Sequence, residues 1–488
     1  MLPTPLRRLP VRGWAVLLLL TSLGPLWAED MSNVYTRPQP PPREALERLN
    51  LKIGWSAYLP VEGLKDGLFS VQVLEKEILV QTRSGLVLVM DAETGKTKWK
   101  VRVGVPYRVT HQLGYNSKLV LVVNQSDLFA LDRSDGRTVW VFRMPGGPTA
   151  PPHADEEQLY LTAMTVTGSR FFAYHIPTAL ELEDYAKRGK GTTNQPVEAR
   201  LKEVSKSPYG VRGGEVTAIG PLSTARESGR KPEEVGPQPR LLWDYITDSR
   251  VDRAPLLLPD TVLLVGEDGR LTAFARTTGS VIYRAPLEAG VGLPPAQFGD
   301  TAYIAAQDQF LYVINIATGR VLWRFSDGAN FAQKPVATDD ALFLGTLRKG
   351  LICLDRETGE TKWKNTEAGR FVAYNPKFVY AFDRSGRFLV LDRERGTKLS
   401  SYDLREFVFP VANDRTDRIY LAAHNGLLVC LHDEDYAKPL YLKTDDKPPP
   451  PPPAEKPGEK PGEKPGEKPG EKPADKPGDK PIDKRENK

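Results

Sequence analysis

The stretch "LDRETGETKWK", residues 354–364, decides the fold because it recurs along the chain. It contains Asp355, a Thr-Gly pair ending at Gly359, and Trp363. A single copy would fit a catalytic loop. Repeated copies indicate instead a turn that belongs to the architecture, because catalysis does not require several sets of the same residues.

Related stretches occur throughout the chain, and each ends at an aromatic residue. They are "LVLVMDAETGKTKW" to Trp99, "LFALDRSDGRTVW" to Trp140, "LTAFARTTGSVIY" to Tyr283, and "LYVINIATGRVLW" to Trp323. The turn glycines are regularly spaced, at Gly95, Gly136, Gly279, Gly319, Gly359 and Gly396. Neighbouring copies are about 40 residues apart, which is the period of a β-propeller blade.

Two degenerate copies complete the series. "FFAYHIP" has a His at the Asp position and opens into an insertion that returns at "LLWDY", and "LLVCLH" has a His at the same position near the end. The eight repeat positions are Asp91, Asp132, His175, Ala275, Asn315, Asp355, Asp392 and His432. Two strand-like runs rich in Val, Ile, Tyr and Phe precede each copy. We therefore predict an all-β fold, an eight-bladed β-propeller of four-stranded antiparallel blades.

The last copy has no final strand of its own. The segment "LKIGWSAYLP", residues 51–60, places Trp55 before an alternating pattern like that after Trp99. We predict that this N-terminal strand closes the eighth blade, because the first and last blades would otherwise expose open edges. The propeller should span residues 51–440.

The quoted residues have a structural interpretation. Gly tolerates the positive φ that a short hairpin turn requires, and Asp can accept hydrogen bonds from backbone N–H groups two or three residues on. A Trp packed on the neighbouring blade buries ~150–250 Å², or about 4–6 kcal/mol as an upper bound. The residues assigned to this role are Trp55, Trp99, Trp140, Trp243, Tyr283, Trp323, Trp363, Asp91, Asp132, Asp355, Asp392, Gly95, Gly136, Gly279, Gly319 and Gly359.

The repeated pattern Ala-x-Asp-x-x-Thr-Gly-x-x-x-Trp resembles the tryptophan-docking repeat of the pyrroloquinoline-quinone (PQQ) repeat superfamily. The resemblance covers roughly residues 51–433. This superfamily includes quinoprotein alcohol dehydrogenases and the lipoprotein propeller of the outer-membrane barrel-assembly machinery. The motif marks the periphery of the blades, so it implies the fold and not the chemistry.

The resemblance also implies what a quinoprotein site would contain: a bridge between adjacent cysteines, a stacking Trp and a calcium with carboxylate and Asn ligands. The sequence has two cysteines, Cys353 and Cys430, which occupy equivalent positions two blades apart. All six Trp residues beyond residue 28 occupy docking positions. We therefore predict no catalytic residues, no metal site and no cofactor, and we assign no cofactor-binding residue.

The segments outside the ring have distinct compositions. Residues 1–28 resemble an export signal, with three arginines before the apolar run "WAVLLLLTSLGPLW", and an N-terminal anchor is the alternative. Residues 29–50 form a Pro-rich linker and a short helix. Residues 178–240 are an insertion in blade three, either a partner-binding arm or a flexible excursion. Residues 441–488 form a Pro/Lys/Glu/Gly-rich tail that we expect to be disordered, as a spacer or a contact with anionic envelope polymers.

The formal net charge is +5, and residues 1–28 and 447–488 carry that excess. The near-neutral remainder argues against a nucleic-acid binder. We predict an exported, periplasmic or extracellular, non-enzymatic scaffold that binds proteins in the cell envelope, monomeric and without a transmembrane segment after signal cleavage. A PQQ-dependent dehydrogenase, or a degenerate relative, is the alternative. A carbohydrate-binding propeller is a third possibility.

Overall fold

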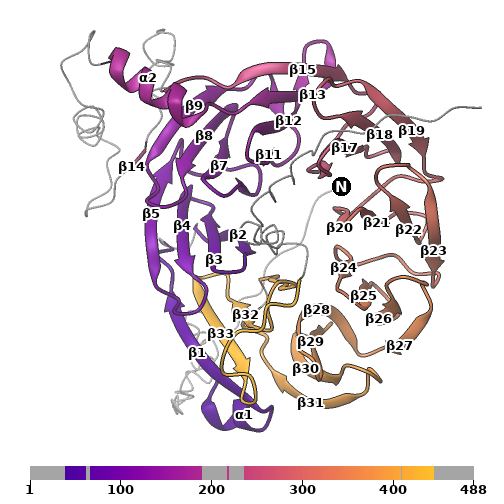
Figure 1. Cartoon of the computed structure of the whole chain (residues 1–488). Coiled ribbons are helices and arrows are strands. Elements are labelled where there is room, and N and C mark those ends of the chain that lie inside the picture. Colours follow the sequence, from indigo (N-terminus) through magenta and orange to yellow (C-terminus); the bar gives the residue numbers. More distant parts are fainter. Residues whose placement is uncertain (1–38, 62–65, 190–216, 219–235, 408, 444–488) are drawn as a thin grey trace, which may run out of the picture. The chain divides into compact units, whose positions relative to one another are not determined.

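The computed structural model describes residues 39–61, 66–189, 217–218, 236–407 and 409–443. These residues form one compact unit in which eight β-sheets follow one another around a ring (Figure 1). The predicted eight-bladed all-β propeller is confirmed. The expected signal at 1–28, most of the insertion and the tail beyond Lys443 lie outside the described residues.

In the first seven blades the strands that begin at the axis run outward in chain order (Figure 1). Blade one contains β2 (Leu68–Val73), β3 (Glu77–Thr82), β4 (Leu86–Asp91) and β5 (Thr97–Val103). Blade two contains β6 (Gly114–Tyr115), β7 (Leu119–Asn124), β8 (Asp127–Asp132) and β9 (Thr138–Arg143). Blade three contains β10 (Gly147–Pro148), β11 (His153–Ala154), β12 (Gln158–Thr165), β13 (Gly168–His175) and β15 (Arg240–Ile246).

Blades four to seven each contain four strands. Blade four has β16 (Leu256–Leu257), β17 (Thr261–Val265), β18 (Arg270–Ala275) and β19 (Val281–Pro286), and blade five has β20 (Ala296–Phe298), β21 (Thr301–Ala305), β22 (Phe310–Asn315) and β23 (Val321–Ser326). Blade six has β24 (Val336–Ala337), β25 (Ala341–Thr346), β26 (Gly350–Asp355) and β27 (Thr361–Asn365). Blade seven has β28 (Ala368–Tyr374), β29 (Phe378–Asp383), β30 (Arg387–Asp392) and β31 (Lys398–Asp403).

The eighth blade joins the two ends of the ring. It contains β32 (Ile419–Ala422), β33 (Leu427–Asp433) and β1 (Leu51–Tyr58), and a single bridge between Phe409 and Ala422 marks its innermost position. β1 pairs antiparallel with β33, from Leu51 opposite Asp433 to Tyr58 opposite Leu427. The predicted closure by the N-terminal strand is confirmed.

The hydrophobic core lies between the blades. The described residues form eight apolar clusters, and each draws its members from two neighbouring blades. The middle strands, such as β7 and β25, are buried at every position because a neighbouring blade covers each of their faces. The helix α1 (Arg43–Glu47) adds Leu46 to the cluster between blades seven and eight.

Two described pieces belong to the insertion of blade three. The helix α2 (Ala179–Gly189) follows β13, and β14 (Thr217–Ala218) pairs in parallel with β5 of blade one. No helix within the described part of the chain is long and apolar enough to cross a membrane.

Candidate functional site

The repeated Trp and Gly residues meet at the boundaries between blades. A Cβ atom built on Gly95 would lie 2.3 Å from the Trp55 ring, and one on Gly136 would lie 2.5 Å from the Trp99 ring. The same relation joins Gly279 to Trp243, Gly319 to Tyr283, Gly359 to Trp323 and Gly396 to Trp363. All six glycines also have positive φ. Each therefore combines a left-handed turn with a ring packed where a side chain would stand.

The docking rings also donate hydrogen bonds across the boundary. The indole Nε1 of Trp55 donates to the Ala92 carbonyl at 3.0 Å, and that of Trp99 donates to the Arg133 carbonyl at 2.8 Å. Further bonds join Trp243 to Arg276, Trp363 to Arg393, and the Tyr283 hydroxyl to Ile316. In each case the acceptor carbonyl belongs to the residue directly after the Asp position of the repeat. The same turn therefore provides the glycine on which the aromatic ring packs and the carbonyl to which the ring donates.

The Asp residues of the repeat hold their own turns. Asp355 Oδ1 accepts the backbone N–H groups of Glu357 and Thr358, and Asp91 Oδ1 accepts that of Thr94. The bond from Thr358, together with nearby Lys362, lowers the pKa of Asp355 to about 2. Asp132 and Asp392 accept equivalent bonds, and Asn315 does so with its amide oxygen. These carboxylates are engaged in turn formation and do not converge on a common site.

The boundary between blades two and three departs from the pattern. Trp140 is fully buried, but its Nε1 has no hydrogen-bond partner among the described residues, and the insertion stands in the sequence where the Thr-Gly turn of blade three would lie. Gly236, with φ +74°, lies against the carbonyl of Val139 and the Cβ of Trp140 instead. The repeat pattern does not identify Gly236, because it lies at the end of the insertion.

The two cysteines, two residues of the innermost strand β28, and Tyr107 before β6 could be considered for chemistry. Cys353 and Cys430 are free and buried, and burial raises the pKa of each thiol to about 12. Phe371 is fully buried in the cluster between blades six and seven, and the Arg370 guanidinium lies over the Phe382 ring. Tyr107 is exposed, with φ +60°. None of these side chains is arranged for nucleophilic chemistry.

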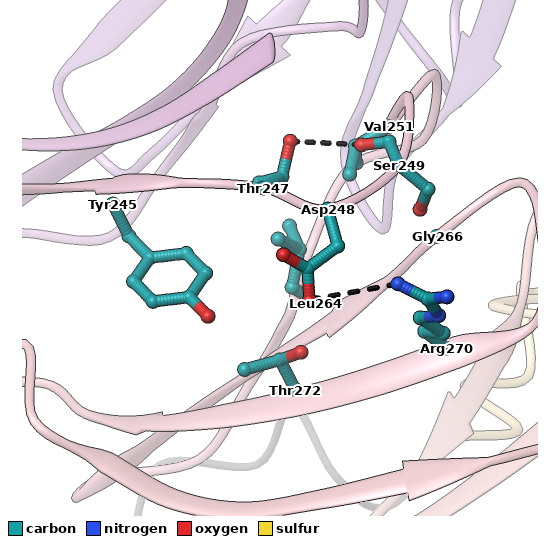
Figure 2. Close-up of a pocket in the computed structure, with 9 residues that line it drawn as sticks. All are labelled: Tyr245, Thr247, Asp248, Ser249, Val251, Leu264, Gly266, Arg270 and Thr272. Atoms are coloured by element: carbon teal, nitrogen blue, oxygen red, sulfur yellow. Dashed lines mark hydrogen bonds and ion pairs between the residues drawn. The ribbon is translucent and has the colours of Figure 1, made fainter. Parts of the chain in front are cut away.

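A small pocket lies between blades three and four (Figure 2). Tyr245, Asp248 and Arg270 line it, and Asp248 lies 3.6 Å from Arg270. Its volume of about 20 Å³ accommodates about one water molecule and not a quinone. Among the described residues, no group of three or more His, Cys, Asp or Glu side chains is placed to hold a metal ion.

The outer strands provide a different kind of site. β19, β23, β27 and β31 are each the last strand of their sheet, so one edge of each has no strand partner among the described residues. Edges of this kind can receive an added strand from another polypeptide. In blade one the chain does this itself, because β14 pairs with the outer edge of β5.

A family comparison agrees with this architecture. The sequence profile of the family described as "Outer membrane protein assembly factor BamB" matches residues 44–230, 236–333 and 307–434. The chain belongs to this family. A comparison with curated protein sequences found no match.

Solved structures show the same fold at low identity. BamB from Moraxella catarrhalis is 17% identical, with a TM-score of 0.52, over 78% of this chain and 97% of that chain. The computationally designed protein Ika8 is 13% identical, with a TM-score of 0.51, over 76% of this chain and 98% of that chain. Because a designed protein matches about as well as a natural one, these likenesses establish the fold alone.

Proposed function

We propose that this chain is an exported, non-enzymatic propeller scaffold that binds a protein partner in the cell envelope. The observation that carries the proposal is the match to the BamB family over most of the ring, between residues 44 and 434. The description of that family names outer membrane protein assembly, and we extend this process to the present chain.

The chemistry of the ring supports a binding role. The repeated Asp, Gly and Trp residues are engaged in turns and blade boundaries, and the pocket between blades three and four accommodates little more than a water molecule. The open outer edges offer backbone groups that suit a polypeptide ligand. The export-like segment at residues 1–28 and the near-neutral charge of the ring also fit an envelope protein.

The test combines location with binding. The full chain, with a C-terminal tag, is expressed in its native host, and the cells are fractionated before and after chemical cross-linking. We expect the chain in the envelope fraction, cross-linked to a discrete protein partner in a fixed ratio. A cytoplasmic location, or no partner above the level of an unrelated exported propeller, would overturn the proposal.

The dehydrogenase alternative has its own test. Purified protein is mixed with the quinone and calcium and then assayed for bound quinone absorbance and for dye-linked alcohol or sugar oxidation. We expect neither signal. Stoichiometric quinone binding with turnover would replace the scaffold proposal.

A further inference from the structure

An apolar pair recurs on the outer strands of three consecutive blades. In blades three, four and five, both residues before the docking aromatic are apolar and solvent-exposed. We define the apolar rim as Leu241, Leu242, Val281, Ile282, Val321 and Leu322. Their exposed fractions run from 37% to 54%. Three adjacent exposed pairs form a pattern, whereas scattered exposed apolar residues are ordinary.

The other blades provide an internal comparison at the same repeat position. Blades one and six have Thr-Lys pairs, Thr97–Lys98 and Thr361–Lys362, and blade seven has Lys398–Leu399. The docking position therefore does not require apolar neighbours.

The chain covers the outer strands of the two preceding blades with its own insertion. In blade one, β14 pairs with β5. In blade two, Gly236 lies against Val139, and Leu182 of α2 packs on the cluster that contains Trp140. No described strand pairs with the outer edges of β19 and β23, and the corresponding side chains of blades three to five keep 37–54% of their surface exposed. These blades follow blade two around the ring (Figure 1).

Three arginines lie on the strands of the apolar rim or in the turn before one of them, and the acidic Asp244 and Glu288 near the rim pair with Arg170 and Arg324. Arg284 on β19 donates to the Tyr245 hydroxyl at 2.6 Å, and Arg324 on β23 lies 3.2 Å from the exposed Glu288. Arg320 is exposed in the turn before β23. Among the described residues, no carboxylate forms an ion pair with Arg284 or Arg320.

We infer that the apolar rim of β15, β19 and β23 binds an extended segment of a partner protein in which apolar and acidic residues alternate. This inference rests on the proposed function and specifies its binding surface. The segment would add as a strand to the free edge of β19 or β23, with its apolar side chains on the rim and its carboxylates beside Arg284, Arg320 or Arg324. A second copy of this chain fits less well, because pairing two rims would bring these arginines together.

The probe is a fluorescent octapeptide in which Val and Glu alternate, and binding is followed by fluorescence anisotropy on the purified full chain. The rim variant carries Val281→Thr, Ile282→Lys, Val321→Thr and Leu322→Lys. These changes transplant the Thr-Lys pair of blades one and six, so the fold should tolerate them. Leu347→Lys is the matched control, because Leu347 is 56% exposed in blade six, away from the rim.

We expect the rim variant to weaken binding at least tenfold and Leu347→Lys to change it less than twofold. A Val-Lys octapeptide should bind at least tenfold more weakly than the Val-Glu peptide. A Val-Glu peptide N-methylated at alternate residues should also bind more weakly, because it cannot donate the main-chain hydrogen bonds of an added strand. The inference is wrong if the rim variant binds the Val-Glu peptide as well as wild type does, or if the charge or N-methylation of the peptide has no effect.

Two other occupants are tested on the same proteins. Sedimentation showing a dimer of wild type that the rim variant abolishes would assign the rim to a second copy. Flotation with phosphatidylglycerol vesicles that is lost in the rim variant would assign it to a membrane. Either result overturns the inference. If the rim variant still cross-links to the native envelope partner, the inference fails while the proposed scaffold function stands.

Discussion

Asp433 accepts a hydrogen bond from the Asn50 side chain at 2.9 Å, across 383 positions of the chain. Asn50 precedes the first strand of the ring, and Asp433 ends the last strand in sequence. Asp433 is buried and also accepts bonds from Asn375 and Tyr380 of blade seven. One carboxylate thus joins the N-terminal strand and the last two blades.

We predict that Asp433→Ala lowers the free energy of unfolding by about 3 kcal/mol, because it leaves several buried donors without an acceptor. The measurement is the midpoint and slope of urea unfolding. Asp435→Ala is the control, because Asp435 pairs with Lys377 at the surface and should contribute less than about 1 kcal/mol. Equal effects of the two variants would show that Asp433 does not hold the closure.

The docking glycines can be compared with a glycine that also has positive φ but has no aromatic ring packed against it. Gly359 has φ +76°, and a Cβ there would lie 2.6 Å from the Trp323 ring. Gly299 has φ +56°, with no atom within 4 Å of a Cβ. Gly299→Ala should cost about 1 kcal/mol for the left-handed conformation alone. Gly359→Ala should cost at least about 1 kcal/mol more, because overpacking is added. Similar urea midpoints would contradict a packing role for Gly359.

The Asp turns predict a specific acid sensitivity. The pKa of Asp355 is lowered from 3.8 to about 2 in the folded chain, chiefly by the bond from Thr358. A lowered folded-state pKa stabilises the protein above the unfolded-state pKa, and this stabilisation is lost as the pH falls from about 4 towards 2. Asp355→Asn keeps the acceptor oxygen, as Asn315 does in blade five, but removes the charge.

The stability of wild type relative to Asp355→Asn should therefore be greatest above pH 5 and fall steeply between about pH 4 and pH 2. The lowered pKa fixes the direction of this change, with wild type losing stability relative to the variant as the pH falls. A difference that stays constant from pH 6 to pH 2 would show that the carboxylate charge is not involved. Asp403→Asn, at the exposed end of β31, is the comparison at a position outside the repeat turns.

Much of the ring was predictable because each blade repeats the same local chemistry. The Thr-Gly turns and the aromatic residues after them recur often enough to give the number of blades, and the unpaired last copy indicated the closing role of Trp55. These features depend on contacts between equivalent positions of neighbouring blades, so the repeated sequence is sufficient to predict them.

Other features depend on contacts that the repeat does not encode. Gly236 lies against Trp140 at the end of an insertion that the other blades lack, and Asp433 meets Asn50 only because the ring closes. The apolar rim was visible in the sequence as Leu-Leu, Val-Ile and Val-Leu before the docking aromatics. Strand patterns alone could not show whether those side chains were buried or exposed, because the outer strands carry both buried and exposed positions.

Blade seven has no docking aromatic. Ser400 occupies that position in blade seven, whereas Trp363 in blade six is buried and donates to the Arg393 carbonyl at 2.7 Å. Trp363→Ser should lower the free energy of unfolding by about 3–5 kcal/mol, because it removes a large buried ring and leaves a cavity at the boundary between blades six and seven. Ser400→Ala should change it by less than about 0.5 kcal/mol. Urea unfolding of both variants measures the comparison. A small effect of Trp363→Ser would mean that the ring tolerates the loss of a docking aromatic in blade six as it does in blade seven, and that the indoles do not hold the blades together.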